Sequence, residues 1–172
     1  MTKLIGIGGV SRSGKSTLAK QIQGHFASRK VLILSQDDFV KDEKEIPKIK
    51  DRTDWEHPDS IDLRSLLRTI DEVKKSHDLI IIEGLLAFYF PALDSLYAHR
   101  ILLTISKETF LFRRQQETRW GPEPEWFWEH VWGSYLKYGQ PSNIPIDTIS
   151  GNKPIEVSQL VRLIKVLDQT NH

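Results

Sequence analysis

The sequence predicts a single three-layer α/β/α domain, built on about five parallel strands with helices on both faces. Short apolar runs lie at residues 3–8, 31–34, 79–82 and 101–105, and helical patterns separate them. Strands that are apolar on both faces and alternate with helices are typical of a parallel sheet covered on both sides. A chain of 172 residues is about the length of one domain and can bury a substantial core.

The elements follow in order along the chain. After the first strand, Leu18, Ile22 and Phe26 are spaced i, i+4 and i+8, as on one face of a helix. A second helical pattern begins at Pro58 and Asp59. The remaining elements are a charged flap over about 40–57, helices over 107–118 and 125–138, a fifth strand over 144–149, a closing helix around 160–167, and a small lid over about 113–125.

Composition excludes several classes of protein. The 24 Lys and Arg residues nearly balance the 23 Asp and Glu residues, which argues against a protein that coats nucleic acid. The absence of cysteine excludes disulfides and thiolate metal sites. The longest apolar run, over 79–90, contains Glu83 and falls short of the ~20 residues of a membrane helix. We therefore expect a soluble cytoplasmic protein without nucleic-acid or membrane partners.

The turn after the first strand carries a phosphate-binding motif. Residues 9–16 match G-x-x-x-x-G-K-[ST], with a strand before them and an amphipathic helix after them. Such a loop points backbone N–H groups and a helix dipole at phosphate oxygens. Lys15 is expected to neutralise the β and γ phosphates, and the Ser16 hydroxyl to bind Mg²⁺. The expected nucleotide-binding residues here are Gly9, Val10, Ser11, Arg12, Ser13, Gly14, Lys15, Ser16 and Thr17.

Proteins with this loop include guanine-nucleotide switches as well as kinases. Switches normally carry D-x-x-G and N-K-x-D motifs. The sequence contains no D-x-x-G, and Asn152-Lys153-Pro154-Ile155 ends in isoleucine where the second motif needs aspartate. The sequence therefore disfavours a GTPase.

Acidic residues follow the second and third strands. Asp37 and Asp38 come after the second strand, and Glu83 comes after the third. In an open α/β sheet, ligands bind beyond the carboxyl ends of the strands, so these carboxylates should face the phosphate loop. Phosphoryl transfer to a hydroxyl needs one carboxylate to accept the proton and others to organise Mg²⁺.

Arginines gather near the expected lid. Arg113 and Arg114 lie on the helix after the fourth strand, and Arg119 precedes the Gly121-Pro122 breaker. Arginines beside such a loop suit charge neutralisation on a transferring phosphoryl group.

Four segments together resemble the nicotinamide riboside kinases, in the uridine kinase-like branch of the P-loop kinases. The segments are Gly9 to Ser16, Ser35-Gln36-Asp37-Asp38-Phe39, Ile81-Ile82-Glu83-Gly84-Leu85-Leu86 and His130 to Tyr138. Trp55-Glu56-His57-Pro58-Asp59 is instead similar to the corresponding segment of uridine kinases, as is Glu83 to Tyr89. The resemblance covers about residues 3–140 and implies a P-loop kinase fold.

The resemblance also implies an activity, namely transfer of the ATP γ-phosphate to the 5′-hydroxyl of a ribonucleoside with Mg²⁺. Nicotinamide riboside is the leading acceptor, which implies a step of NAD biosynthesis. Carried over by position, the catalytic residues are Asp37 as base, Glu83 as the Mg²⁺-organising acid, Lys15 and Arg114. Arg113 and Arg119 would bind ATP, and Ser16 and Glu83 would hold the metal.

The resemblance further implies the acceptor site. Glu56 stands where the family has the aspartate that binds the ribose 2′ and 3′ hydroxyls. Trp55 and Trp120 would stack on the base, and a cationic nicotinamide ring would gain a cation–π attraction that neutral uridine lacks. The expected acceptor-binding residues are Asp37, Asp38, Trp55, Glu56, Arg114 and Trp120.

Two alternatives remain at this stage. One is another acceptor, such as uridine, cytidine, or a small sugar or acid. The tyrosine- and histidine-containing segment by which uridine kinases hold the pyrimidine has no counterpart before Leu79, which weakens uridine. The other is a nucleotide-binding module without catalysis, and the presence of Lys15, Asp37 and Glu83 argues against it.

Overall fold

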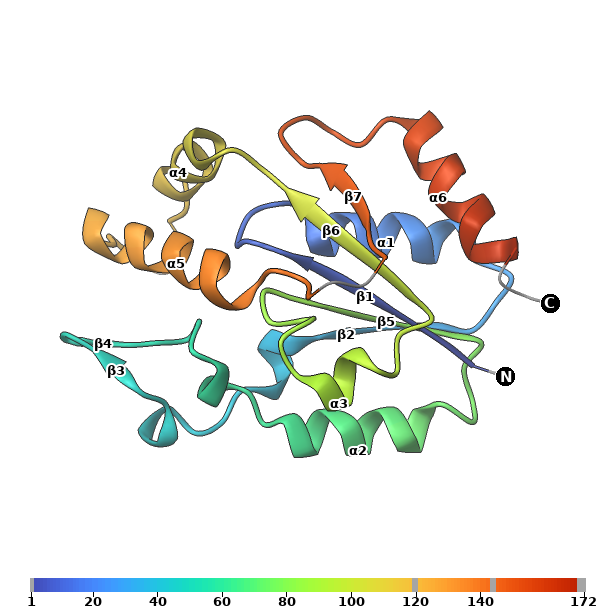
Figure 1. Ribbon diagram of the computed structural model, residues 1–172, viewed down its shortest axis with the longest axis horizontal. Coiled ribbons are helices and arrows are strands. Elements are labelled where there is room, and N and C mark those ends of the chain that lie inside the picture. Colours follow the sequence, from blue (N-terminus) through green and yellow to red (C-terminus); the bar gives the residue numbers. More distant parts are fainter. Residues whose placement is uncertain (1, 119–120, 143–144, 170–172) are drawn as a thin grey trace.

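The computed structural model describes residues 2–118, 121–142 and 145–169, and within them it contains a five-stranded parallel sheet (Figure 1). The strand order is β2-β5-β1-β6-β7. The strands are β1 (Lys3–Gly9), β2 (Val31–Ser35), β5 (Leu79–Gly84), β6 (His99–Thr104) and β7 (Asp147–Ser150). This arrangement confirms the predicted fold class.

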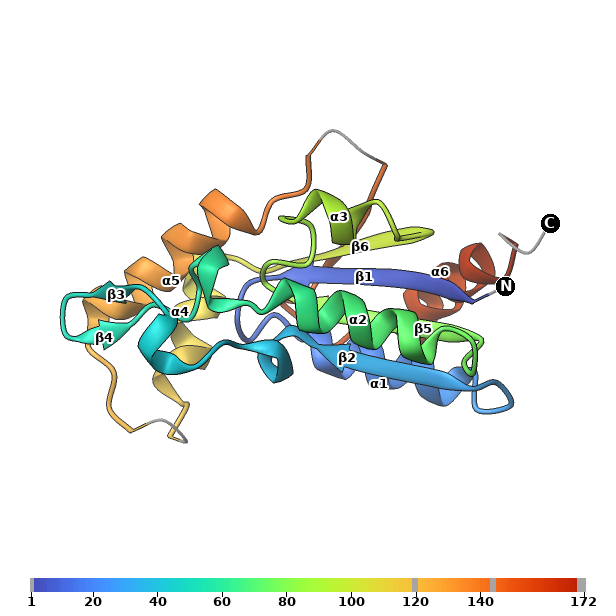
Figure 2. The same cartoon turned by 90° about the horizontal axis from the view of Figure 1, so that it is seen from below.

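Helices cover both faces of the sheet. One face packs against α1 (Lys15–His25) and α6 (Val157–Gln169), through side chains that include Leu18, Ile22 and Leu163. The other face packs against α2 (Leu63–Val73) and the short α3 (Pro91–Asp94). Figures 1 and 2 together show the three layers. None of the helices in the described part of the chain combines the length and apolar character that a membrane-spanning helix needs.

A third apolar cluster lies beyond the carboxyl ends of the strands. It joins α4 (Lys107–Gln115) to α5 (Glu125–Tyr138), and its buried members include Phe110 and Val131. Ile49, on the short hairpin formed by β3 (Lys48–Ile49) and β4 (Arg52–Thr53), packs against the same cluster. The hairpin and α5 therefore lie at one end of the sheet, as Figure 1 shows.

Several boundaries differ from those expected. Pro58–Ser60 forms a separate 3₁₀ turn, and α2 begins only at Leu63, because the Asp62 side chain accepts a hydrogen bond from the Ser65 amide and caps the helix there. The expected start at Pro58 is wrong. The fifth strand begins at Asp147, and α4 ends at Gln115 rather than Thr118.

Candidate active site

A cleft of about 630 Å³ opens at the carboxyl ends of β1, β2 and β5. This is where an open α/β sheet binds ligands. Its lining comes from the loop between β1 and α1, the turn after β2, the segment before α2, the end of β5, and α4. The lining residues are Ser11, Arg12, Gly14, Lys15, Ser16, Thr17, Gln36, Asp37, Trp55, Glu56, Ile61, Glu83, Gly84, Leu85, Leu86, Arg113, Arg114 and Glu117.

The phosphate loop has the backbone that its glycines allow. Gly9 and Gly14 have φ angles of 152° and 101°, in the region that side chains rarely adopt. A Cβ on Gly9 would lie 2.6 Å from both the Leu103 carbonyl oxygen and Ser13 Oγ. Arg12 has a φ of 67° without being glycine, which is backbone strain of the kind that gathers at ligand sites. No side chain caps the start of α1, so its N–H groups stay available to an anion.

Lys15, Ser16 and Glu83 meet at the start of α1. Ser16 Oγ donates to Glu83 Oε1 at 2.9 Å, and Lys15 Nζ donates to the Val10 carbonyl at 2.9 Å. Burial lowers the pKa of Lys15, while the nearby carboxylates of Glu83 and Asp37 act in the opposite direction. The Lys15 ammonium therefore lies where it can neutralise the negative charge of a bound phosphate.

The same residues fit Mg²⁺. In the described part of the chain, no group of three acidic or histidine side chains is arranged to hold a metal ion. One hydroxyl and one carboxylate instead meet directly beside the phosphate loop. Mg²⁺ commonly binds through one or two carboxylates together with substrate phosphates and waters, so this donor set suits the ion. Ser16 and Glu83 are the residues that would hold it.

Asp37 lies on the 3₁₀ turn Gln36–Phe39, directly after β2, and lines the cleft. Its side chain is open to the cleft, but the protein surrounds it enough that loss of solvation raises the pKa of its carboxyl, against the lowering effect of Lys15. Gln36 fixes this turn, because its side-chain oxygen accepts a hydrogen bond of 3.0 Å from the Leu86 amide. Asp38 is exposed and is not among the cleft-lining residues, so the structure does not bring it to the site.

Trp55 and Glu56 also line the cleft, from the irregular segment between β4 and α2. Trp55 is 42% exposed, which leaves an indole available to a ligand. Burial is the main reason that the pKa of Glu56 rises to about 7, and Arg114 acts against that rise. Glu56 Oε2 is buried without a hydrogen-bond partner. A buried acceptor without a partner is costly, and a ligand hydroxyl could satisfy it.

The segment that carries these two residues is tied down from two sides. Asp54 Oδ1 lies 2.8 Å from Nε2 of His130 on α5. Ser60 Oγ donates to the Trp55 carbonyl at 2.8 Å, and Asp54 and Ser60 are both buried. Neither Asp54 nor His130 was among the site residues predicted from the sequence. The only available signal was a histidine inside the motif His130 to Tyr138.

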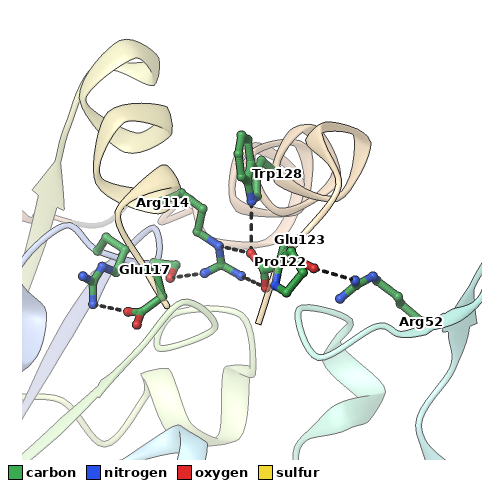
Figure 3. A network of polar contacts seen from close by, with 8 residues as sticks. Arg52, Arg114, Glu117, Pro122, Glu123 and Trp128 are labelled. Atoms are coloured by element: carbon green, nitrogen blue, oxygen red, sulfur yellow. Dashed lines mark hydrogen bonds and ion pairs between the residues drawn. The ribbon is translucent and has the colours of Figure 1, made fainter. Parts of the chain in front are cut away.

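The arginines of α4 face the phosphate loop. Arg113 donates to the backbone carbonyls of Arg12 at 2.8 Å and Gly151 at 2.7 Å, so part of its guanidinium already has protein partners. Arg114 pairs with both carboxylate oxygens of Glu123, as Figure 3 shows. Its Nη1 donates to Ser11 Oγ at 2.9 Å.

Further residues join these arginines at the site. Arg12 forms an ion pair of 2.7 Å with Glu117. Glu117 and Glu123 were not expected at the site. The predicted residues Arg119 and Trp120 lie outside the described residues.

Comparison with known proteins agrees with this geometry. A family model described as an AAA domain matches residues 5–125. Nicotinamide riboside kinase 1 of Homo sapiens is 34% identical, over 81% of this chain and 77% of that protein. A uridine kinase of Clostridium botulinum is 40% identical over a shorter region, 46% of this chain and 38% of that protein. A gluconokinase structure from Sinorhizobium meliloti aligns with 99% of this chain and over 98% of its own length. The TM-score of 0.59 at 17% identity shows a shared fold. The chain therefore belongs to the family that the AAA-domain model describes and to the nicotinamide riboside kinases.

Proposed function

We propose that this chain transfers the γ-phosphoryl group of ATP to the 5′-hydroxyl of nicotinamide riboside. This reaction would be a step of NAD biosynthesis. One observation carries the proposal. A single cleft holds a phosphate loop with Lys15, a potential base in Asp37, and an exposed indole beside an unsatisfied carboxylate in Trp55 and Glu56. These are the parts that a nucleoside kinase needs in one place.

The roles follow from position. The phosphate loop and Lys15 bind and neutralise the phosphates of ATP. Asp37 accepts the proton of the attacking hydroxyl, and its raised pKa suits a group that must take a proton near neutral pH. Arg114 stabilises negative charge on the transferring group from the side of α4. When bound at Ser16 and Glu83, Mg²⁺ would screen the charge of the phosphates.

Glu56 and Trp55 would select the acceptor. The free carboxylate oxygen of Glu56 would accept hydrogen bonds from the ribose hydroxyls. The indole of Trp55 would stack on the base, and a cationic ring gains ~0.5–1 kcal/mol when exposed and ~2 kcal/mol or more when desolvated. Since ~1.4 kcal/mol is a factor of ten, we expect a preference for nicotinamide riboside over uridine of roughly tenfold or more. Segments 40–57 and 113–125 would act as flap and lid.

The direct experiment is product identification. The protein is incubated with Mg-ATP and, separately, with nicotinamide riboside, uridine, cytidine and a small sugar, and the mixtures are analysed by mass spectrometry. We expect the monophosphate of nicotinamide riboside as the main product. A main product of uridine monophosphate would move the uridine kinase alternative ahead. ATP consumption without any phosphorylated acceptor would favour a nucleotide-binding module instead.

The Trp55→Ala variant distinguishes stacking from mere space filling. It should weaken the binding of nicotinamide riboside more than that of uridine, because only the nicotinamide ring is cationic. An equal loss for both acceptors would contradict the cation–π contact.

A further inference from the structure

Glu123 makes three polar contacts on the lid side of the cleft. Its Oε2 accepts from Arg114 Nε at 2.8 Å and from Trp128 Nε1 at 3.0 Å, and its Oε1 accepts from Arg114 Nη2 at 2.9 Å. The side chains of Arg114 and Glu123 are each only 9% exposed. Figure 3 shows this two-pronged arginine–carboxylate pair, a geometry that fixes direction as well as distance. The low exposure of both side chains shields the pair from solvent.

The pair aims Arg114 at the phosphate loop. With Nε and Nη2 held by Glu123, the remaining nitrogen, Nη1, donates to Ser11 Oγ at 2.9 Å. In the described part of the chain, the side-chain hydrogen bonds of Arg114 go to these two residues. One guanidinium thus links the lid to the loop that would bind ATP.

A second carboxylate lies within the electrostatic reach of Arg114. Arg114 has the largest charge effect on Glu56 and acts to lower its pKa, yet Glu56 Oε2 has no hydrogen-bond partner. Glu56 is also faced by Asp54 on its own loop, by His130 on α5, by Asp37 after β2, and by Lys15 on α1. Of the cations in this set, Arg114 has the largest effect on the pKa of Glu56. Its guanidinium is already paired with Glu123.

We propose that Glu123 is a positioning residue, which holds Arg114 against the phosphate loop and away from Glu56, so that the Glu56 carboxylate stays free for the hydroxyl groups of the acceptor. Without the charge of Glu123, the guanidinium would turn to Glu56, which lines the same cleft and already lies within its electrostatic reach. The acceptor would then have to displace Arg114 before it could bind. This inference rests on the proposed function only for the identity of the ligand, because the pairing itself can be measured without turnover.

The test is a titration of the Glu56 carboxyl by ¹³C NMR, in the whole protein without substrates. The Glu56 resonance is assigned by its loss in Glu56→Gln. In the Glu123→Gln variant, whose amide oxygen can still accept from Trp128, the midpoint of Glu56 should fall by about one pH unit or more, as expected for a carboxylate that gains an arginine partner. Glu123→Asp keeps the charge and should retain most of the wild-type midpoint. An unchanged midpoint in Glu123→Gln would overturn the proposal.

Two controls separate this mechanism from a general change of charge. Glu125→Gln removes an exposed carboxylate two residues away and should leave the Glu56 midpoint in place. In an Arg114→Met background, Glu123→Gln should no longer lower the midpoint, because the cation that mediates the effect is gone. A fall of the same size in that background would show that Glu123 acts directly on Glu56, and would contradict the positioning role.

The acceptor provides a further readout. At pH 8 the KM for nicotinamide riboside should rise at least threefold in Glu123→Gln, and Glu123→Asp should restore it. If no nucleoside is phosphorylated by the wild type, the proposed function fails, and the titration still decides whether Glu123 holds Arg114 away from Glu56.

Discussion

The two sides of the cleft are built differently. On the proposed donor side, the phosphate loop lies between β1 and α1, and its shape comes from backbone angles at Gly9, Arg12 and Gly14. On the proposed acceptor side, Trp55 and Glu56 lie on an irregular segment, which is tied to α5 through the Asp54–His130 pair. The donor side is fixed by local backbone geometry, and the acceptor side by side chains far apart in the sequence.

This difference indicates which side of the cleft can tolerate changes of amino acid. A phosphate loop tolerates little change, because its N–H groups must converge on one ligand. The acceptor side can be altered by exchanging side chains on the flap and on α5 while the sheet stays in place. Arg52 Nη2 donates to the Pro122 carbonyl at 3.3 Å, as Figure 3 shows. Lys50 lies over the ring of Trp126 on α5. Both contacts connect the hairpin of β3 and β4 to the segment around α5, and neither involves the phosphate loop.

The largest effect is expected on the donor side. Lys15→Ala should lower kcat by about 10³-fold or more, because electrostatic donors aimed at developing charge contribute ~10²–10³ each and this one carries a full charge. The measurement is a coupled ADP-release assay, and circular dichroism checks that the fold is intact. Activity within tenfold of wild type would refute the phosphate-loop assignment.

Asp37→Asn should lower kcat by at least ~10², the low end for loss of a general base, with ATP affinity nearly unchanged. Because the pKa of Asp37 is raised, kcat of the wild type should fall with decreasing pH at a higher pH than an ordinary carboxyl would give. Asp38→Asn is the matched control, since Asp38 does not line the cleft, and it should leave kcat within a few-fold of wild type. Loss of ATP binding with kcat retained would instead make Asp37 a structural residue.

The Asp54–His130 pair links α5 to the acceptor side alone. His130→Ala should raise the acceptor KM roughly tenfold, because leaving a buried carboxylate without its partner costs ~1–3 kcal/mol. The KM for ATP should stay within twofold. Initial-rate kinetics in both substrates measure the split, and an equal rise in both constants would show that the two sides are not separate.

Glu56→Gln should change the free energy of unfolding, an effect smaller than the kinetic effects above. The pKa of Glu56 is 4.5 in the unfolded chain and about 7 in the folded one, so its proton stabilises the fold fully below pH 4.5, and that stability is lost as pH rises through 7. Glutamine cannot ionise, so the variant should be more stable than wild type at pH 8 by about 1–2 kcal/mol, after allowance for partial exposure, and close to wild type at pH 5.

Chemical denaturation at the two pH values measures this difference. Glu45→Gln, on the exposed part of the flap, is the matched control and should show no such pH dependence. A Glu56→Gln variant less stable than wild type at pH 8 would contradict an uncompensated charge at this position.

Sequence alone predicted much of the fold and the donor side. Apolar runs identify the four main strands, because strands buried on both faces must be apolar throughout. The phosphate loop is recognisable because its chemistry depends on residues close together in the chain. Glu83 and Asp37 followed from one topological rule, that the carboxyl ends of parallel strands share an edge.

The acceptor side was only partly predictable. The pairs Asp54–His130 and Arg114–Glu123 depend on how loops and α5 pack in three dimensions, and no local pattern encodes that packing. Asp38 was expected beside the acceptor, but the tight 3₁₀ turn Gln36–Phe39 gives neighbouring residues different directions, and only Asp37 lines the cleft. The start of α2 was misplaced because the cap at Asp62 overrides the helix-opening signal of Pro58.

The most direct test of the account is a comparison of Glu56→Ala with wild type, using nicotinamide riboside and its 2′-deoxy analogue as acceptors in one assay. We expect the variant to raise the KM for the riboside at least tenfold, to affect the 2′-deoxyriboside less, and to leave the KM for ATP unchanged. An equal effect on both acceptors, or a parallel rise in the KM for ATP, would contradict an acceptor side that holds the ribose hydroxyls independently of the donor side.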